Sequence, residues 1–279
     1  MLVALIKNEL IKISSKWRSY IGFIALVVLM PLVMWGFSVG GSEIHEDMTH
    51  QLEDNFIVVG SAFNGFLATY LVMNFLWVHI PFLVTLVAGD VVAGEGAAGT
   101  FRIYLTRPVS RAKILFSKLL ATFIYTLALI IFFALLSLGL GSIWLGTGDL
   151  VVFDEGILIL SAELAWVRFA LAFCFATASL FVVAALCFMF SAMVNNGIGP
   201  VIGSMAIVII GLAISTIPLD LFERISPYLF TDYVDIWNLA FKDPIPWSEI
   251  IKSLLVLLLY TTVFSGIGFV AFLRKDIRT

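Results

Sequence analysis

Charged residues are scarce in this chain: Asp, Glu, Lys and Arg make up 13% of its 279 residues. A soluble globular domain carries about 25% charged and about 45–50% apolar residues, whereas 61% of this chain is hydrophobic. Because so few charges cannot cover a compact soluble fold, the excess apolar side chains must face lipid. The composition therefore excludes an ordinary cytosolic enzyme and a disordered chain.

Cysteine is also scarce, with only Cys174 and Cys187 in the chain. The two lie 13 residues apart in one apolar stretch, which is roughly 20 Å along a helix and too far for a mutual disulfide. The sequence therefore excludes a secreted disulfide scaffold. We interpret both thiols as packed or lipid-facing.

Long apolar runs, in contrast, are abundant. Six of them contain no Asp, Glu, Lys or Arg, and each has the length of about 18 residues or more that a membrane-spanning helix needs. They cover residues 20–37, 66–89, 119–144, 169–194, 198–219 and 253–273. Because backbone groups in lipid must be hydrogen-bonded within their own segment, the runs are predicted to be helices. The predicted fold class is an all-α membrane protein with six transmembrane helices in one domain, residues 1–279.

Lysine and arginine are sorted between the predicted connections. Residues before the first run, between the second and third runs, and after the sixth run hold 12 of the 16 basic residues. The first-to-second connection has five acidic residues and no basic one. Since basic residues mark the cytoplasmic side, we predict a multi-pass protein of the cell (inner or cytoplasmic) membrane with both termini in the cytoplasm.

Residues 1–18 have apolar side chains at helical spacing and charged side chains on another side. The apolar residues are Leu2, Ile6, Leu10, Ile13 and Trp17, and the charged residues of interest are Lys7, Glu9, Lys12 and Lys16. This pattern predicts an amphipathic helix in the cytoplasmic interface. Two roles are open for it: a plain membrane anchor, or an anchor that also contacts a soluble partner.

Residues 94–112 lie in the longest predicted cytoplasmic connection. Small residues and glycines open it, residues 101–105 have the composition of a short helical piece, and Pro108 interrupts any helix there. Ser110 is predicted to be the N-cap of the third span. On charge alone, the favoured interpretation is a basic stop signal that fixes topology. The alternative is a compact knob that docks on another protein.

Residues 218–247, on the opposite predicted side, are rich in aromatic side chains. These are Tyr228, Phe230, Tyr233, Trp237, Phe241 and Trp247. Aromatic residues with polar tips concentrate at the membrane–water interface, so we predict short interfacial helices or a re-entrant segment. An aromatic belt is the favoured role, and an outer lid or a docking surface for an external subunit is the alternative.

Chemistry-bearing residues are nearly absent from the six runs. His79 is the one ionisable side chain inside them, and it is a candidate pathway residue without the second group that acid–base catalysis usually needs. His45 and His50 are five residues apart, which does not fit the zinc-binding i, i+4 spacing. Residues 94–99 match G-x-G-x-x-G in letters only, without a βαβ context. No catalytic residue, metal or cofactor is therefore expected in this chain.

Several of these features together resemble the permease subunit of type-2 ABC transporters. The residue-level similarity lies in Glu95-Gly96-Ala-Ala-Gly99-Thr100, then Arg107-Pro108-Val109-Ser110-Arg111, then Lys118-Leu119. The N-terminal segment with Lys7-Asn8-Glu9-Leu10 and the six spans match the family's topology. In that family the connection between the second and third spans forms a short cytoplasmic coupling helix, which seats in a cleft of the ATPase subunit.

The resemblance implies the permease subunit of an ATP-driven exporter. It implies two copies of a separate cytosolic ABC ATPase, which would hold ATP and Mg, and a second permease copy in a homodimer. The residues expected by position to couple to the ATPase are Glu95, Gly96, Gly99, Thr100, Arg102, Arg107, Pro108, Ser110 and Arg111. The alternative within the family is a mechanotransmission subunit that drives an external accessory protein without moving cargo. No nucleic acid partner is expected.

Overall fold

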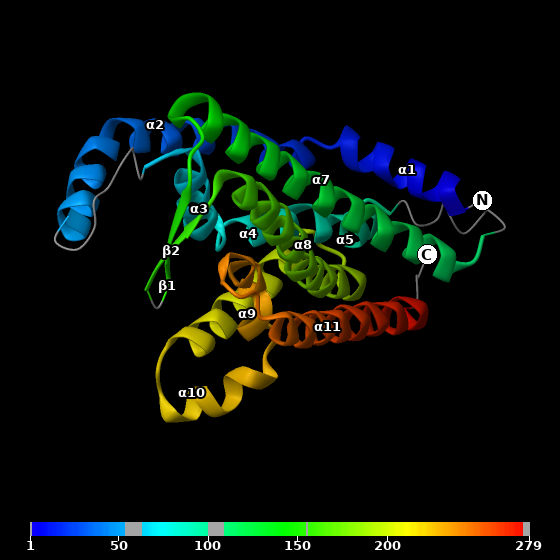
Figure 1. Ribbon diagram of the computed structural model, residues 1–279. Helices are drawn as coiled ribbons and strands as arrows, with labels where there is room; N and C mark the ends of the chain where they lie inside the picture. Colours follow the sequence, from blue (N-terminus) through cyan, green and yellow to red (C-terminus); the bar gives the residue numbers. More distant parts are fainter. Residues whose placement is uncertain (1, 54–62, 100–108, 155, 276–279) are drawn as a thin grey trace.

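The computed structural model describes residues 2–53, 63–99, 109–154 and 156–275, with the backbone alone for residues 41–53, 153, 154 and 156. The described chain is mostly helical (Figure 1). Its elements in order are α1 (Leu2–Ser15), α2 (Arg18–Glu53), α3 (Gly65–Leu76), α4 (Ile80–Ala88), α5 (Asp90–Ala97), α7 (Arg111–Leu145), β1 (Leu150–Asp154), β2 (Gly156–Leu160), α8 (Ala162–Met193), α9 (Ile198–Thr216), α10 (Asp220–Ile225), the 3₁₀ helices η1 (Ser226–Tyr228) and η2 (Phe230–Phe241), and α11 (Trp247–Arg274).

Six helical segments are long and apolar enough to cross a membrane, as the sequence predicts. They are Arg18–Gly40, Ile80–Ala97, Arg111–Leu145, Ala162–Met193, Ile198–Thr216 and Trp247–Arg274. Large apolar side chains remain exposed along α2, α9 and α11, for example Leu32, Ile210 and Leu258. Exposed apolar surface on this scale is typical of helices that face lipid.

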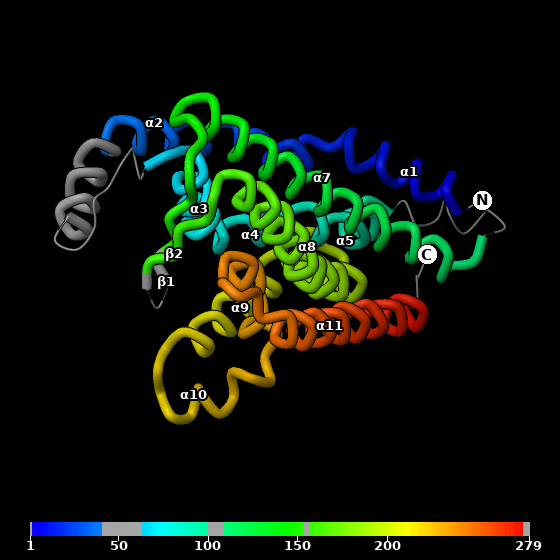
Figure 2. Tube along the Cα trace, viewed as in Figure 1, coloured from blue at the N-terminus to red at the C-terminus, as the bar shows by residue number. Residues whose placement is uncertain are grey.

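Helix α8 forms the centre of the helical bundle and contacts α4, α7, α9, α11 and η2. Buried alanines, including Ala172, Ala176 and Ala184, let neighbouring helices approach α8 closely. Phe169 and Phe173 fill the space between them, and Phe169 stacks on Phe66 of α3 with ring centroids 5.8 Å apart. The tube view shows α8 running between α7 and α11 (Figure 2).

The connections between helices gather at two opposite ends of the molecule (Figure 1). Helix α1, the end of α5, the start of α7 and the end of α11 lie at one end. The far end of α2, the β1–β2 hairpin and α10 lie at the other. Helix α1 and the end of α11, the last described helix, therefore share one end of the bundle.

The predicted second span, residues 66–89, is not one helix. It is divided into α3 and α4, with a turn at residues 77–79, and α5 begins directly after it at Asp90. Pro81 explains the first break, because proline lacks an N–H and its ring clashes with the carbonyl four residues earlier in a continuous helix. The apolar segment that is long enough to span the membrane is Ile80–Ala97. It includes Asp90 and Glu95, which the sequence interpretation placed in a loop.

The prediction of an all-α chain misses the β1–β2 hairpin. Leu150 pairs with Leu160, and Val152 pairs with Leu158, in an antiparallel register. Leu150, Val152 and Leu160 are buried, while Ile157 and Ile159 are exposed. This two-residue alternation is a strand signal, but it falls in a short connection between two much stronger apolar runs.

The predicted short helices in residues 218–247 are present as α10, η1 and η2. Their aromatic residues do not form one surface belt, since Phe230, Trp237 and Phe241 are buried while Tyr228 and Trp247 are exposed. Helix η2 packs on α8, α9 and α11. It is therefore part of the apolar core and not only an interfacial segment.

Candidate functional site

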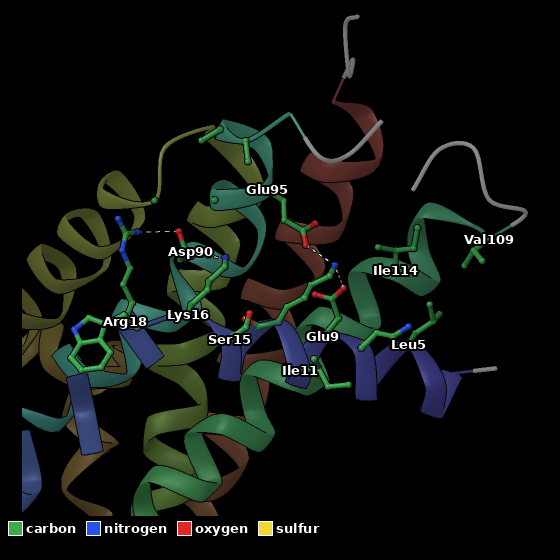
Figure 3. Close-up of a pocket in the computed structure, with 17 residues that line it drawn as sticks. Leu5, Glu9, Ile11, Ser15, Lys16, Arg18, Asp90, Glu95, Val109 and Ile114 are labelled. Carbon is green, nitrogen blue, oxygen red and sulfur yellow. Dashed lines mark hydrogen bonds and ion pairs between the residues drawn. The ribbon is translucent and has the colours of Figure 1, made fainter. Parts of the chain in front are cut away.

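The candidate site is the end of the molecule where α1, α5 and α7 meet. Helices α5 and α7 are the two stems of the connection that contains the predicted coupling region, residues 94–112. Helix α1 lies against them and brings its charged residues to the same place (Figure 3). The sequence prediction put those charges on a different side of an interfacial helix from the apolar residues. In the structure Glu9 is buried, whereas Trp17 of the apolar stripe is 74% exposed.

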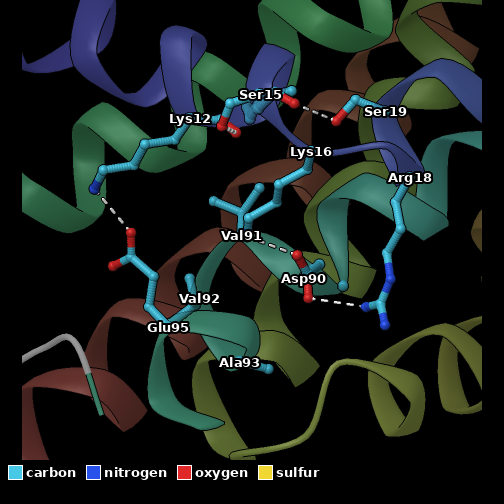
Figure 4. Close-up of polar contacts among 12 residues, drawn as sticks. Lys12, Ser15, Lys16, Arg18, Ser19, Asp90, Val91, Val92, Ala93 and Glu95 are labelled. Atoms are coloured by element: carbon cyan, nitrogen blue, oxygen red, sulfur yellow. Dashed lines mark hydrogen bonds and ion pairs between the residues drawn. The ribbon is translucent and has the colours of Figure 1, made fainter. Parts of the chain in front are cut away.

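Four charged side chains from these three helices form a closed cluster, which we name the charge ring: Glu9, Lys12, Glu95 and Lys118. The Lys118 Nζ atom lies 2.7 Å from Glu9 Oε2 and 2.8 Å from Glu95 Oε1. The Lys12 Nζ atom lies 2.9 Å from Glu9 Oε1 and 2.8 Å from Glu95 Oε1. Each ammonium group thus contacts both carboxylates. The pairing of Lys12 with Glu95 is drawn in Figure 4.

Burial makes the charge ring structurally important. Lys118 is 0% exposed, Glu9 is 4% exposed and Glu95 is 8% exposed. A buried charge is strongly unfavourable unless it is paired and hydrogen-bonded. Lys118 meets this requirement with two carboxylates and with a 3.1 Å hydrogen bond to the Val91 carbonyl oxygen. The ring therefore holds α1, α5 and α7 in one arrangement.

A second ionic cluster lies beside the charge ring, around Asp90. Lys16 Nζ is 2.7 Å from Asp90 Oδ2, and Arg18 Nη1 is 3.1 Å from Asp90 Oδ1 (Figure 4). Two glycines leave room for this carboxylate. A Cβ atom on Gly94 would lie 2.4 Å from Asp90 Oδ1, and one on Gly197 would lie 2.8 Å from the same atom. Asp90 therefore joins the α1–α2 corner to α5.

Ser191 of α8 supports the break between α4 and α5. Its hydroxyl donates to the Gly89 carbonyl oxygen at 2.7 Å. Ser191 Oγ also accepts from the backbone N–H of Val92 at 3.2 Å and from that of Ala93 at 2.9 Å. Backbone groups at a helix terminus lack partners within the helix, so this one side chain satisfies several of them. The charged end of α5 is thereby fixed to the centre of the bundle.

An open groove of about 1220 Å³ runs along α1 beside these clusters. Lys12, Lys16 and Arg18 line it together with Asp90 and Glu95 (Figure 3). Apolar residues also line it, among them Leu5, Ile11, Trp17, Val109 and Ile114. The groove thus combines paired charges with apolar side chains at the stems of the connection.

The predicted coupling residues divide into two groups. Glu95 and Gly96 are part of α5, Gly99 has a left-handed φ of 66° just after it, and Arg111 begins α7. Ser110 takes the N-cap position, although its side chain makes no capping hydrogen bond. The remaining predicted residues, Thr100, Arg102, Arg107 and Pro108, lie outside the described residues.

The structure adds residues to the site that the sequence interpretation did not assign to it. Lys118 was quoted only as part of a motif, and Asp90, the residue after the second run, was given no role. The available signal was that each adjoins an uncharged apolar run, where an isolated charge needs a partner.

Lys7 is exposed on α1. His79 is exposed at the turn before α4, with Nδ1 3.2 Å from the Phe75 carbonyl oxygen, and its pathway role stays a prediction.

The fold and this site define a helical, multi-pass membrane protein with a buried ionic cluster at one end of the bundle. The chain belongs to the family described as "Protein of unknown function (DUF2705)", whose model matches residues 26–278. That match contains Asp90, Glu95 and Lys118, whereas α1, with Glu9 and Lys12, precedes it.

The chain is also similar to the "Uncharacterized protein YhcI" of Bacillus subtilis (strain 168). The two are 27% identical over 199 residues, which is 69% of this chain and 63% of the relative. This chain thus matches less than two thirds of the relative's length.

Proposed function

We propose that this chain is the transmembrane permease subunit of an ATP-driven ABC exporter, whose ATP is hydrolysed by a separate cytosolic ATPase. The observation that carries the proposal is the charge ring. It ties both stems of the connection, α5 and α7, to α1 through Lys118. A force applied to the connection by an ATPase would move these three helices together. Transmission of this kind needs a rigid element with different contacts in two states.

The sequence similarity to type-2 ABC permeases supports the same assignment. In that interpretation Arg107 and Arg111 face the ATPase, and the paired charges behind them supply rigidity. The partners would be two ATPase copies, carrying ATP and Mg, and a second copy of this chain.

The membrane orientation belongs to the same proposal: the α1 end of the bundle faces the cytoplasm. Helix α1, the start of α7 and the end of α11 lie at that end (Figure 1), and all three carry basic residues, which favour the cytoplasmic side. Single cysteines in a cysteine-free background test it. A membrane-impermeant maleimide applied to intact cells should label Asp220→Cys and should not label Ser14→Cys. The reverse pattern would invert the topology.

The ATPase partnership is tested by copurification and by ATP hydrolysis. The chain is coexpressed with the ABC ATPase encoded beside it, and the complex is reconstituted in liposomes. The double variant R107E/R111E should lose the complex and the chain-dependent ATPase activity, because two contact charges are reversed. Arg224→Glu, in exposed α10 at the opposite end, is the matched control. Unchanged complex formation in the double variant would refute the assignment.

The polar side chains of the spans favour an amphipathic or apolar cargo. Thr122, Thr126 and Thr177 each donate a hydrogen bond to the carbonyl oxygen four residues earlier in their own helix. Thr261 and Thr262 do the same in α11. These hydroxyls are therefore already used within their helices, and they offer little to a hydrophilic solute.

The same observation suits the alternative function, a mechanotransmission subunit that moves no cargo. Proteoliposomes with the ATPase and a fluorescent lipid in one leaflet distinguish the two. ATP-dependent movement of the lipid supports export. ATP hydrolysis without movement of this or other amphipathic probes supports mechanotransmission.

A further inference from the structure

A small cavity lies between α3, α9 and η2, on a part of the molecule separate from the charge ring. Its volume is about 330 Å³, near the lower end of the range of about 300–1,000 Å³ that ligand pockets occupy. Trp77 and the nearby Asn74 line one side, Leu212 of α9 lines another, and Asp235, Trp237 and Asn238 of η2 complete it.

Two buried polar atoms of the η2 wall have no hydrogen-bond partner in the part of the chain that the structure describes. They are Trp237 Nε1, on a side chain that is 1% exposed, and Asn238 Oδ1. Buried polar atoms in folded proteins are nearly always hydrogen-bonded. A donor and an acceptor left over on adjacent residues that line one cavity point to a ligand with complementary groups, although both atoms are closed to solvent and meet such a ligand only once the two side chains turn toward the cavity.

Asp235 gives the cavity a negative charge. Its carboxylate has no Lys or Arg ion-pair partner among the described residues. Asp235 is exposed. Partial loss of solvent beside the protein wall raises the pKa of its carboxyl, a hydrogen bond from Trp77 lowers that pKa, and the charge of Asp232 raises it. The carboxylate thus lies beside a protein wall with its charge uncompensated.

Aromatic and apolar surfaces complete the chemical character of the cavity. The Trp77 and Trp237 rings have centroids 5.6 Å apart, and indole faces attract cations. On the α9 side the lining is formed by Ile209, Leu212 and Ala213. An amphipathic molecule with a cationic head group would place that head group near the indoles and Asp235, and its apolar tail along α9.

We propose that this cavity binds an amphipathic primary amine that carries an oxygen acceptor close to its ammonium group. In the bound state the ammonium lies against Asp235. The Trp237 and Asn238 side chains turn toward the cavity, so that the ammonium donates to Asn238 Oδ1 and the Trp237 N–H donates to the ligand's oxygen. A quaternary ammonium is disfavoured because it has no N–H for Asn238. The same head-group chemistry occurs in an ethanolamine lipid and in a free long-chain amino alcohol. The binding site stands independently of the ATPase partnership.

The test measures binding to the purified full chain in neutral detergent, without any ATPase. The probes are an ethanolamine lysolipid, a choline lysolipid with the same acyl chain, a long-chain amino alcohol, and the diol that replaces its amine by a hydroxyl. The ethanolamine lysolipid is compared with the choline lysolipid, and the amino alcohol with the diol. We expect the amine probe to bind about tenfold or more tightly in at least one of these two pairs. Preference for the lysolipid identifies a lipid source, and preference for the amino alcohol identifies a free amphiphile.

Asp235→Asn should abolish that preference, because it removes the charge without changing the size of the side chain. Asp232→Asn, an exposed carboxyl on the same helix, is the matched control and should keep it. Trp237→Phe should weaken binding of the amine probe severalfold. Elution volume and thermal unfolding of each variant check the fold. The proposal is overturned if no probe binds, or if each amine probe binds no better than the choline lysolipid or diol paired with it. It is also overturned if Asp235→Asn and Asp232→Asn change the preference equally.

Discussion

The charge ring and the η2 cavity wall are both polar regions inside an apolar protein, and they differ in how their polar atoms are used. In the ring, each ammonium contacts two carboxylates, and Lys118 has a backbone carbonyl as well. In the cavity wall, Trp237 Nε1 and Asn238 Oδ1 are left without described partners. Satisfied buried networks rigidify a structure, whereas unsatisfied ones destabilise it unless a ligand completes them. Substitutions in the two regions should therefore change stability in opposite directions.

The largest effect is expected from Lys118→Met, which breaks the charge ring. The substitution keeps the length of the side chain but removes the buried cation, so that Glu9 and Glu95 share only the partly exposed Lys12. Removing one partner of a buried pair typically costs about 3–5 kcal/mol. The free energy of unfolding, measured by denaturant titration in detergent with tryptophan fluorescence, should fall by that amount.

Lys113→Met is the control for this prediction. Lys113 is exposed on the same helix, α7, so its loss should change stability by less than about 0.5 kcal/mol, as is usual for surface sites. If both variants unfold at the same denaturant concentration, the charge ring does not stabilise the junction of α1, α5 and α7.

The ring also shows where sequence reasoning ends. The six apolar runs could be predicted because lipid imposes one requirement on every residue of a span. The ring could not, because Glu9, Glu95 and Lys118 are distant in sequence and meet only after three helices have packed. The turn at residues 77–79 was hidden because its residues are as apolar as the helices on either side, with only Pro81 as a signal.

A second, smaller effect is expected from Ser191→Ala, which tests how the ring is held by the rest of the bundle. The substitution removes the hydroxyl that serves Gly89, Val92 and Ala93 at the start of α5. Leaving such buried groups unsatisfied costs about 1–3 kcal/mol, and denaturant titration should show that loss. Thr177→Ala on the same helix is the control, since its hydroxyl bonds the Phe173 carbonyl within α8. Equal losses in the two variants would contradict the supporting role of Ser191.

Lys12→Met should have a smaller effect than Lys118→Met, although both residues contact the same two carboxylates. The Lys12 side chain is 37% exposed, whereas that of Lys118 is 0% exposed. Water screens a partly exposed pair, and such pairs contribute about 1 kcal/mol or less. Raising the salt concentration should narrow the stability gap between the wild type and Lys12→Met. A gap as large as that for Lys118→Met would mean that burial does not decide the strength of these pairs.

The smallest effect, and the one of opposite sign, is expected in the cavity wall. Asn238→Leu replaces an amide whose oxygen is buried without a described partner by an apolar group of similar size. Because removing an unsatisfied polar atom relieves a desolvation penalty, the free energy of unfolding should rise by about 0–1 kcal/mol, while binding of the amine probe is lost. Asn74→Leu is the matched control: its amide donates to the Tyr70 carbonyl oxygen, so no gain is expected there. A clear loss of stability in Asn238→Leu would show that this residue is satisfied in the folded protein, and the contrast with the charge ring would then fail.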